Sequence, residues 1–116
     1  MESSEYFTLS FNVPATHANS VREAMGNAGA GHLGEYSFCS FSIKGTGRFK
    51  PSLESNPFVG KAGVIEEVDE EKIETVCHKD LLESVIDAIK SAHPYEEMVI
   101  DIYPIYRIGR KEAKKN

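Results

Sequence analysis

The feature that most constrains the fold is an internal repeat, in which the second half of the chain follows the pattern of the first at an offset of 64 residues, as from Ser20 to Ser84. In each half, a segment suited to a strand is followed by an amphipathic helical segment and a second extended segment. The helical positions that are identical are Ser20, Val21, Ala24 and Ala28 in the first half and Ser84, Val85, Ala88 and Ala92 in the second. The repeat predicts a duplicated β-α-β unit. Two such units, interleaved, form an α+β, ferredoxin-like sandwich with an antiparallel four-stranded sheet and both helices on one face.

Local patterns indicate where the elements lie. Residues 6–13 alternate between apolar and polar side chains, as in a half-buried strand. We expect Thr16 to cap the first helix and the glycines from Gly29 onward to end it. Residues 79–92 carry the strongest apolar helical face, and Pro94 ends that helix. The remaining expected strands are 36–44, 73–77 and 98–105.

Between the two halves lies an excursion, at about residues 45–68. Its first part, residues 45–63, holds four glycines and two prolines around apolar side chains, which is too apolar for a solvent linker and too interrupted for a helix. We therefore expect an extra hairpin with arms at 46–50 and 63–68 and a loop at 52–60. Residues 1–106 are predicted to form a single domain.

Charge and cysteine content limit the surroundings of the protein. The chain has 116 residues, a net charge of −5 and two cysteines, with no apolar run of the length of a membrane span or signal segment. These features favour a cytoplasmic protein without a membrane partner. Residues 107–116 hold five Lys and Arg residues against Glu112, which predicts a flexible basic tail. The rest of the chain is acidic and would repel a phosphate backbone, so we do not expect nucleic acid as a partner.

Several motifs fail as known chemical sites. The glycines of residues 29–34 fit G-x-G-x-x-G, but they follow a helix, whereas a dinucleotide fingerprint opens one. Residues 45–50 lack the ending of a phosphate-binding Walker loop, and no serine lies on a nucleophile elbow. The acidic run at 66–71 lacks the spacing of a calcium loop, and we interpret it as a solvated charged segment.

The candidate site lies where each helix passes into the following strand. His32 and Cys39 flank the first passage, and His93 with Glu96 and Glu97 lies in the second. If the halves are related by pseudo-symmetry, the two passages should meet at one end of the sheet or across a subunit boundary. The hypothetical metal ligands for a divalent cation are His32, Cys39, His93 and Glu97. The alternative is that these residues have structural roles and form no site. His93 would then be a cation at a helix end, Cys39 would lie in the core, and both glutamates would lie in a solvated turn.

Four strings of the sequence resemble one known module and occur in its order. The module is the domain inserted in bacterial YqfO-type members of the NGG1-interacting-factor-like dinuclear-metal family, which also occurs as a stand-alone protein. The resemblance covers about Tyr6 to Ile105. The strings are Gly29-Ala30-Gly31-His32-Leu33-Gly34-Glu35-Tyr36-Ser37, Gly45-Thr46-Gly47-Arg48-Phe49-Lys50-Pro51, Asn56-Pro57-Phe58-Val59-Gly60, and His93-Pro94-Tyr95-Glu96-Glu97 through Asp101-Ile102-Tyr103-Pro104.

The resemblance implies a fold similar to the PII signalling and CutA divalent-cation-tolerance proteins, which are typically trimers. It also implies that the metal ligands of the full-length family lie in flanking domains, so a hydrolase-like activity is not carried over. We therefore expect a homo-oligomer, a trimer or alternatively a dimer, that binds a small ligand or a divalent metal in a regulatory or sensing role. The candidate ligand-binding residues are His32, Ser37, Gly47, His93, Tyr95 and Glu96.

Two other functions remain open. In a structural or protein-interaction module, the glycines together with Pro57, Phe58 and Tyr95 would serve only packing and subunit contacts. In a small enzyme, a His/Glu pair shared between subunits would carry the chemistry, and His93 would be essential. Of the functions considered, an enzyme is the least favoured, and we name no catalytic residue.

Overall fold

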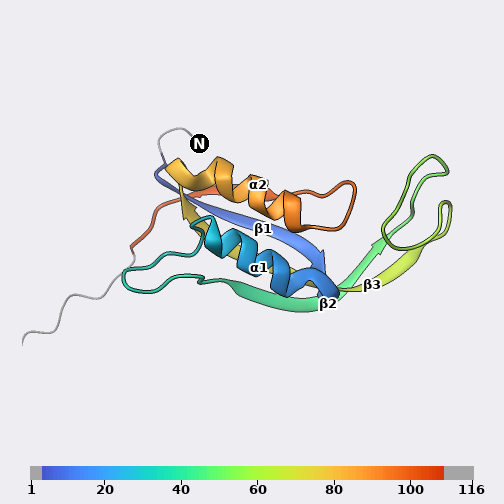
Figure 1. Ribbon diagram of the computed structural model, residues 1–116, viewed down its shortest axis with the longest axis horizontal. Helices are drawn as coiled ribbons and strands as arrows, with labels where there is room; N and C mark the ends of the chain where they lie inside the picture. The colour runs from blue at the N-terminus through green and yellow to red at the C-terminus, as the bar shows by residue number, and fades with distance from the viewer. Residues whose placement is uncertain (1–3, 109–116) are drawn as a thin grey trace, which may run out of the picture.

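The computed structural model describes residues 4–108, and residues 1–3 and 109–116 lie outside the described part (Figure 1). Most of the predicted basic tail therefore falls outside it. The two repeated units are each strand, helix, strand, and a short 3-10 turn precedes each helix. The elements are β1 (Tyr6–Pro14), η1 (Ala15–His17), α1 (Ala18–Asn27), β2 (Phe41–Phe49), β3 (Glu66–His78), η2 (Lys79–Leu81), α2 (Leu82–Ala92) and β4 (Asp101–Ile105).

The four strands form one antiparallel sheet in the order β2-β3-β1-β4. Both helices cover the same face of this sheet, and no helix of residues 4–108 covers the opposite face (Figure 1). The predicted ferredoxin-like sandwich is thus confirmed. Within residues 4–108, no helix is long and apolar enough to cross a membrane.

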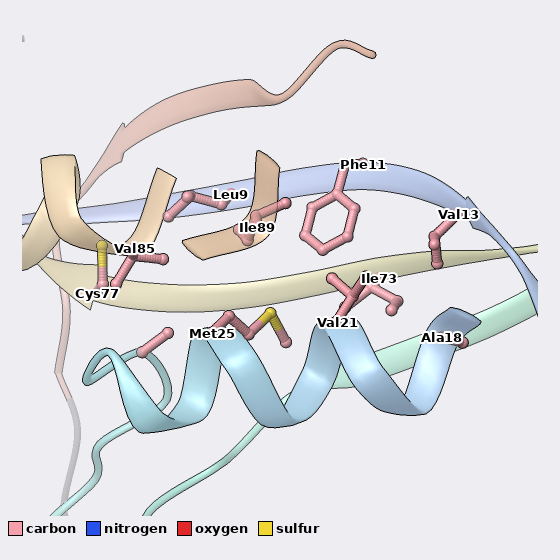
Figure 2. Packing of buried hydrophobic residues seen from close by; sticks show 11 residues of the cluster. Leu9, Phe11, Val13, Ala18, Val21, Met25, Ile73, Cys77, Val85 and Ile89 are labelled. Carbon is pink, nitrogen blue, oxygen red and sulfur yellow. The ribbon is translucent and has the colours of Figure 1, made fainter. Parts of the chain in front are cut away.

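The core lies between the sheet and the two helices (Figure 2). The alternation predicted for the first strand is confirmed, because Leu9, Phe11 and Val13 on β1 all face the helices and are at most 3% exposed. Val21 of α1 and Val85 of α2 hold the same position of the repeat, and both are fully buried. The remaining buried members of this cluster are Ala18, Met25, Ala30, Ile73, Cys77 and Ile89.

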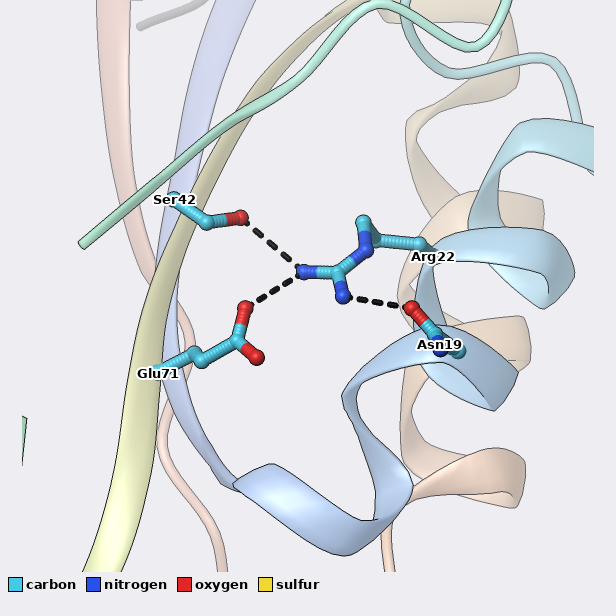
Figure 3. Close-up of polar contacts among 4 residues, drawn as sticks. All are labelled: Asn19, Arg22, Ser42 and Glu71. Atoms are coloured by element: carbon cyan, nitrogen blue, oxygen red, sulfur yellow. Dashed lines mark hydrogen bonds and ion pairs between the residues drawn. The ribbon is translucent and has the colours of Figure 1, made fainter. Parts of the chain in front are cut away.

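A polar contact joins α1 to the sheet beside this core (Figure 3). The guanidinium of Arg22 donates hydrogen bonds to Glu71 at 2.7 Å, Ser42 at 3.0 Å and Asn19 at 2.7 Å. Glu71 lies on the helix side of β3 because it is in phase with Ile73, and it is only 9% exposed. The interpretation of the acidic run as fully solvated is therefore wrong at this residue.

The hairpin of β2 and β3 extends past the end of β1, because β1 ends opposite Glu70 (Figure 1). Residues 46–49 and 66–69 form the extension, and residues 50–65 form the loop, which we call the excursion loop. Gly63 donates its N–H to the carbonyl of Pro51 at 2.6 Å and closes the base of this loop. The predicted extra hairpin is thus the outer part of the β2-β3 pair, continuous with the main sheet.

Several boundaries differ from the sequence prediction, and the last strand begins at Asp101, three residues later than expected. The strand expected from residue 36 begins at Phe41, because Phe38 takes a φ of 59°, which extended backbone does not allow. Thr16 does not cap a helix, since its hydroxyl hydrogen-bonds to the Nδ1 atom of the adjacent His17 ring at 2.9 Å. A 3-10 turn makes the entry into α1 instead.

Candidate functional site

The two helix-to-strand passages lie at opposite ends of the sheet. Gly31, in the first passage, donates its N–H to Val76 near the end of β3, where β3 pairs with Tyr6 at the start of β1. His93, at the start of the second passage, bonds the carbonyl of Asn12 near the other end of β1. The prediction that one chain brings the passages together is wrong. The physical reason is that β1 and β3, which begin the two units, run antiparallel, so the second unit is inverted.

The first passage, residues 28–40, is held by backbone contacts and exposes its side chains. Cys39 donates its N–H to Gly31 at 3.0 Å and accepts a hydrogen bond from the Thr75 hydroxyl at 2.9 Å through its carbonyl. The side chains of His32, Ser37 and Cys39 are exposed, so the alternative that Cys39 is a core residue is also wrong. The structure therefore groups these three residues away from the other candidates.

At the opposite end, a groove of about 610 Å³ opens on the uncovered face of the sheet, and we call it the hairpin-end groove. Its walls are the excursion loop and the second passage, and its floor is formed by β1, β2 and β3. Three of the four strings that carry the family resemblance contribute to it. Four predicted site residues line it, namely Gly47, Tyr95, Glu96 and Glu97.

Tyr95 lies at the junction of these walls. Its hydroxyl donates a hydrogen bond of 2.7 Å to the Glu70 carboxylate of β3. Burial, followed by the hydrogen bond and negative charge of Glu70, raises the pKa of the Tyr95 phenol above its ordinary value. The Tyr95 phenol therefore keeps its proton and is the donor of this hydrogen bond, and the Glu70 carboxylate is the acceptor. Gly47 of β2 makes this arrangement possible, because a Cβ atom there would overlap the Glu70 carboxylate.

His93 supports the same wall from beneath. Its Nε2 atom lies 2.7 Å from the carbonyl of Asn12, and its Nδ1 atom accepts the N–H of Tyr95 at 3.2 Å. A carbonyl only accepts, so the proton is on Nε2 and both ring nitrogens are engaged. Burial lowers the pKa of His93 despite the Asn12 hydrogen bond and the charge of Glu70. Because Nδ1 accepts a hydrogen bond, the ring is neutral in this arrangement, and the alternative of a cation at the helix end does not fit it.

Glu96 connects the two walls directly, since its carboxylate accepts the N–H of Asn56 in the excursion loop at 3.0 Å. Glu96 and Glu97 are both exposed, which agrees with the alternative that they lie in a solvated turn. Lys50 and Lys72 also line the groove, and neither takes part in an ion pair within residues 4–108. Beside aromatic and acidic groups, the groove thus offers these two ammonium groups and the guanidinium of Arg48, which pairs with Glu67.

The described residues do not gather a metal site in one chain. Within residues 4–108, no three side chains of His, Cys, Asp or Glu come close enough together to hold a metal ion. Of the hypothetical ligands, His32 and Cys39 lie at one end of the sheet, and His93 and Glu97 at the other.

Sequence reasoning missed most of the groove lining, including Phe49, Lys50, Glu70 and Lys72. The ring of Phe49 lies 5.7 Å from that of Tyr95. A signal was available for part of this set, because Glu70 and Lys72 alternate in β3 with the core-facing Glu71 and Ile73, which places them on the opposite face.

Comparison with known proteins places this chain within longer relatives. No model of a protein family matches it. It is 52% identical over 97 residues to a GTP cyclohydrolase 1 type 2 homolog of Halalkalibacterium halodurans, covering 84% of this chain and 26% of that protein. A protein of the same name from Bacillus subtilis is 50% identical over 114 residues, covering 93% of this chain and 31% of that protein. The chain therefore spans about a quarter to a third of the length of these relatives.

Solved structures show the same relationship and define the fold. A Bacillus cereus protein related to NIF3 superposes with a TM-score of 0.75 at 44% identity, covering 91% of this chain and 27% of that one. The periplasmic divalent cation tolerance protein CutA of Archaeoglobus fulgidus has a TM-score of 0.63 at 19% identity, covering 92% and 89%. Arabidopsis thaliana PII bound to citrate has a TM-score of 0.60 at 18% identity, covering 90% and 79%. The chain is thus homologous to one segment of the YqfO-like proteins named GTP cyclohydrolase 1 type 2 homolog and of a NIF3-related protein, and its fold is that of CutA and PII.

Proposed function

We propose that this chain is a regulatory or sensing module that binds a small organic ligand in the hairpin-end groove. The observation that carries the proposal is the convergence of three family-like strings on one groove of about 610 Å³, which is in the range of small-molecule sites. The cyclohydrolase named in the relatives belongs to proteins three to four times longer, and we do not propose that activity for this chain.

The side chains that line the groove suit a ligand that has both a flat apolar part and an anionic part. The rings of Phe49, Phe58 and Tyr95 line it and offer surfaces for stacking. The ammonium groups of Lys50 and Lys72 lie at the same groove and would attract a carboxylate or phosphate. A divalent metal is the competing ligand that the sequence suggested.

The test is calorimetric titration and thermal unfolding of metal-stripped protein with ADP, citrate, Zn²⁺ and Mg²⁺ as separate probes. A probe that binds the native state raises the midpoint of unfolding in a saturable way. We expect this for an anionic organic probe, with a loss of affinity of about tenfold in Lys72→Gln from the removed charge contact. Lys90→Gln on the exposed side of α2 is the matched control and should bind normally. If only the metal ions bind, or if no probe binds, the proposal is wrong.

His32, Ser37 and Cys39 belong to the site only if another copy of the chain brings them to the groove. The separation of the two passages within one chain makes this a test of assembly. A loss of probe binding in both His32→Ala and His93→Ala would indicate a site shared between subunits. A loss in His93→Ala alone would indicate a site complete in one chain.

We also propose that the protein is a cytoplasmic homo-oligomer, a trimer or alternatively a dimer. Support comes from the uncovered sheet face, where Phe41, Ile43 and Tyr103 are between 52% and 65% exposed. The unpaired edges of β2 and β4 provide further contact surface. The cytoplasmic location is supported by two free thiols, Cys39 and Cys77.

Light scattering tests the oligomeric state. The measured mass should be a multiple of the mass of one chain, and it should fall to the mass of one chain in Ile43→Lys. Phe58→Ala is unsuitable for this test because Phe58 lines the groove.

A further inference from the structure

Tyr95 contacts three segments that are far apart in the sequence. Its hydroxyl reaches Glu70 of β3, and its ring lies 5.7 Å from Phe49 of β2 and 6.4 Å from Phe58 of the excursion loop. Its own N–H is held by His93, whose ring lies 5.0 Å away. The Tyr95 side chain is thus wedged between the sheet and the excursion loop.

The hydrogen-bond partner of Tyr95 is itself held in place. The Glu70 carboxylate fills the space that a side chain on Gly47 would take, so an alanine there would push Glu70 away from Tyr95. The partly buried surroundings of Tyr95 strengthen its bond to the carboxylate, and losing the hydroxyl would leave Glu70 without that donor.

The excursion loop makes two further contacts close to Tyr95. Asn56 donates its N–H to Glu96, the next residue along from Tyr95, at 3.0 Å. Phe58 also packs edge-on against the His17 ring at 5.2 Å. Within residues 4–108, the hydrogen bonds and ring contacts from this loop to other segments are these two and the contact between Phe58 and Tyr95. We therefore expect the order of the loop to depend on the wall that Tyr95 supports.

We infer that Tyr95 is a positioning residue that ties the excursion loop to the second passage, so that the two walls of the hairpin-end groove order as one unit. The hydrogen bond from the Tyr95 hydroxyl to Glu70, next to Gly47, fixes the orientation of the Tyr95 ring. The ring in turn contacts Phe58 and so holds the excursion loop. This inference deepens the proposed function, because it names how groove occupancy would be passed to the protruding hairpin. The coupling of the two walls by Tyr95 does not depend on any ligand.

Amide hydrogen exchange of the ligand-free protein, read by mass spectrometry, tests the inference with Tyr95→Phe and Gly47→Ala. We expect exchange to rise about fivefold in both residues 50–60 and residues 93–100, as the loss of one hydrogen bond predicts. Gly47→Ala should have the same effect although it leaves Tyr95 unchanged. Tyr36→Phe, on the exposed first passage, is the matched control and should change neither segment.

Three outcomes would overturn the inference. The first is faster exchange in residues 93–100 alone, which means that the loop is ordered independently. The second is an equal rise in residues 28–40, which means a loss of global stability instead of a local coupling. The third is no change in either variant.

Adding ADP or citrate then separates the two proposals. If neither probe binds, the proposed function fails while the exchange result stands. If a probe binds and protects only one wall, the coupling is wrong and the site remains.

Discussion

The two helix-to-strand passages occupy equivalent places in the repeat and are built in different ways. The first is organised by backbone around Gly31, and it turns His32 and Cys39 toward solvent. The second is organised by side chains, with His93 and Tyr95 bonded to groups on β1 and β3. A duplicated scaffold thus preserves the path of the chain, while the polar contacts that define a site are present in one copy only.

The helices before these passages differ in the same manner. Arg22 of α1 and Ile86 of α2 hold the same position of the repeat. Arg22 binds a buried carboxylate on the sheet, whereas Ile86 packs against the apolar core. One half is therefore held to the sheet partly by charge and the other by apolar packing, and mutations should affect the two halves differently.

The largest effect is expected for Gly31→Ala, which attacks the backbone-built passage. Gly31 has a φ of +82°, and a Cβ atom there would overlap the backbone of Cys39. Because backbone cannot move aside as a side chain does, we expect a loss of about 2 kcal/mol or more in the free energy of unfolding. Denaturant unfolding measures it.

Gly34→Ala is the matched control for that variant. It has a φ of +58° with open space around it, so only the conformational strain of about 1 kcal/mol should appear. Equal losses in the two variants would show that the contact with Cys39 carries no weight.

Arg22→Met should produce the next largest loss, about 2 kcal/mol, because it leaves the nearly buried Glu71 without its cation. The Arg22 side chain is 28% exposed, so solvent screening reduces the loss below that of a fully buried pair. Chemical denaturation of the double variant Arg22→Met, Glu71→Gln should recover part of it. No recovery would mean that Arg22 acts through packing of its stem and not through charge.

The second passage should make stability depend on pH through His93. Burial lowers the pKa of His93 in the folded protein below the ordinary value of 6.5, so the unfolded chain binds the proton more readily. The free energy of unfolding should therefore be highest above that pH. It should fall as the pH drops below about 6.5, by at most about 1.4 kcal/mol per pH unit.

Unfolding curves between pH 7.5 and pH 5 test this dependence. His93→Gln should flatten the pH profile as well as lower stability, and His32→Gln, which removes an exposed ring from the other passage, is the control. An unchanged slope in His93→Gln would assign the dependence to other groups.

The smallest effect is chemical, and it concerns the two thiols. Burial raises the pKa of Cys77 to about 11, whereas Cys39 is exposed in the first passage. At pH 8 a thiol reagent should label Cys39 quickly and Cys77 only after unfolding, with little change in stability. Mass spectrometry of the labelled peptides gives the order, and early labelling of Cys77 would contradict the buried position.

Most of the fold could be predicted from the sequence because its signals are local and occur twice. The alternation in residues 6–13 and the helical face of residues 79–92 each report burial on one side, and both are confirmed. The start of β2 could not be predicted, since residues 36–44 read as extended. Only the positive φ of Phe38, whose ring packs over Gly26, breaks that strand.

Less of the candidate site than of the fold could be predicted from the sequence. Gly47 and Tyr95 were identified within strings that resemble a family, and Glu96 from its place in the second passage; the structure groups the three in one groove. The bond between Tyr95 and Glu70 joins residues whose proximity depends on the inversion of the second unit and on the register of β3. Spacing along the chain does not contain that information. The same inversion separates His32 from His93, although each follows a helix.

The hairpin that extends past β1 has a further consequence, for the behaviour of the protein at high concentration. Where only β2 and β3 pair, neither outer edge of the ribbon is paired with another strand of residues 4–108, so its backbone groups could pair with another chain. Charged side chains occupy this stretch, including Arg48, Glu66, Glu67 and Asp69, and Arg48 and Glu67 form an ion pair at 2.8 Å. Each of these charges would have to be desolvated if two ribbons joined edge to edge. The projecting ribbon is thereby protected against aggregation, and replacing its charges with valine or threonine should lower solubility without altering the fold.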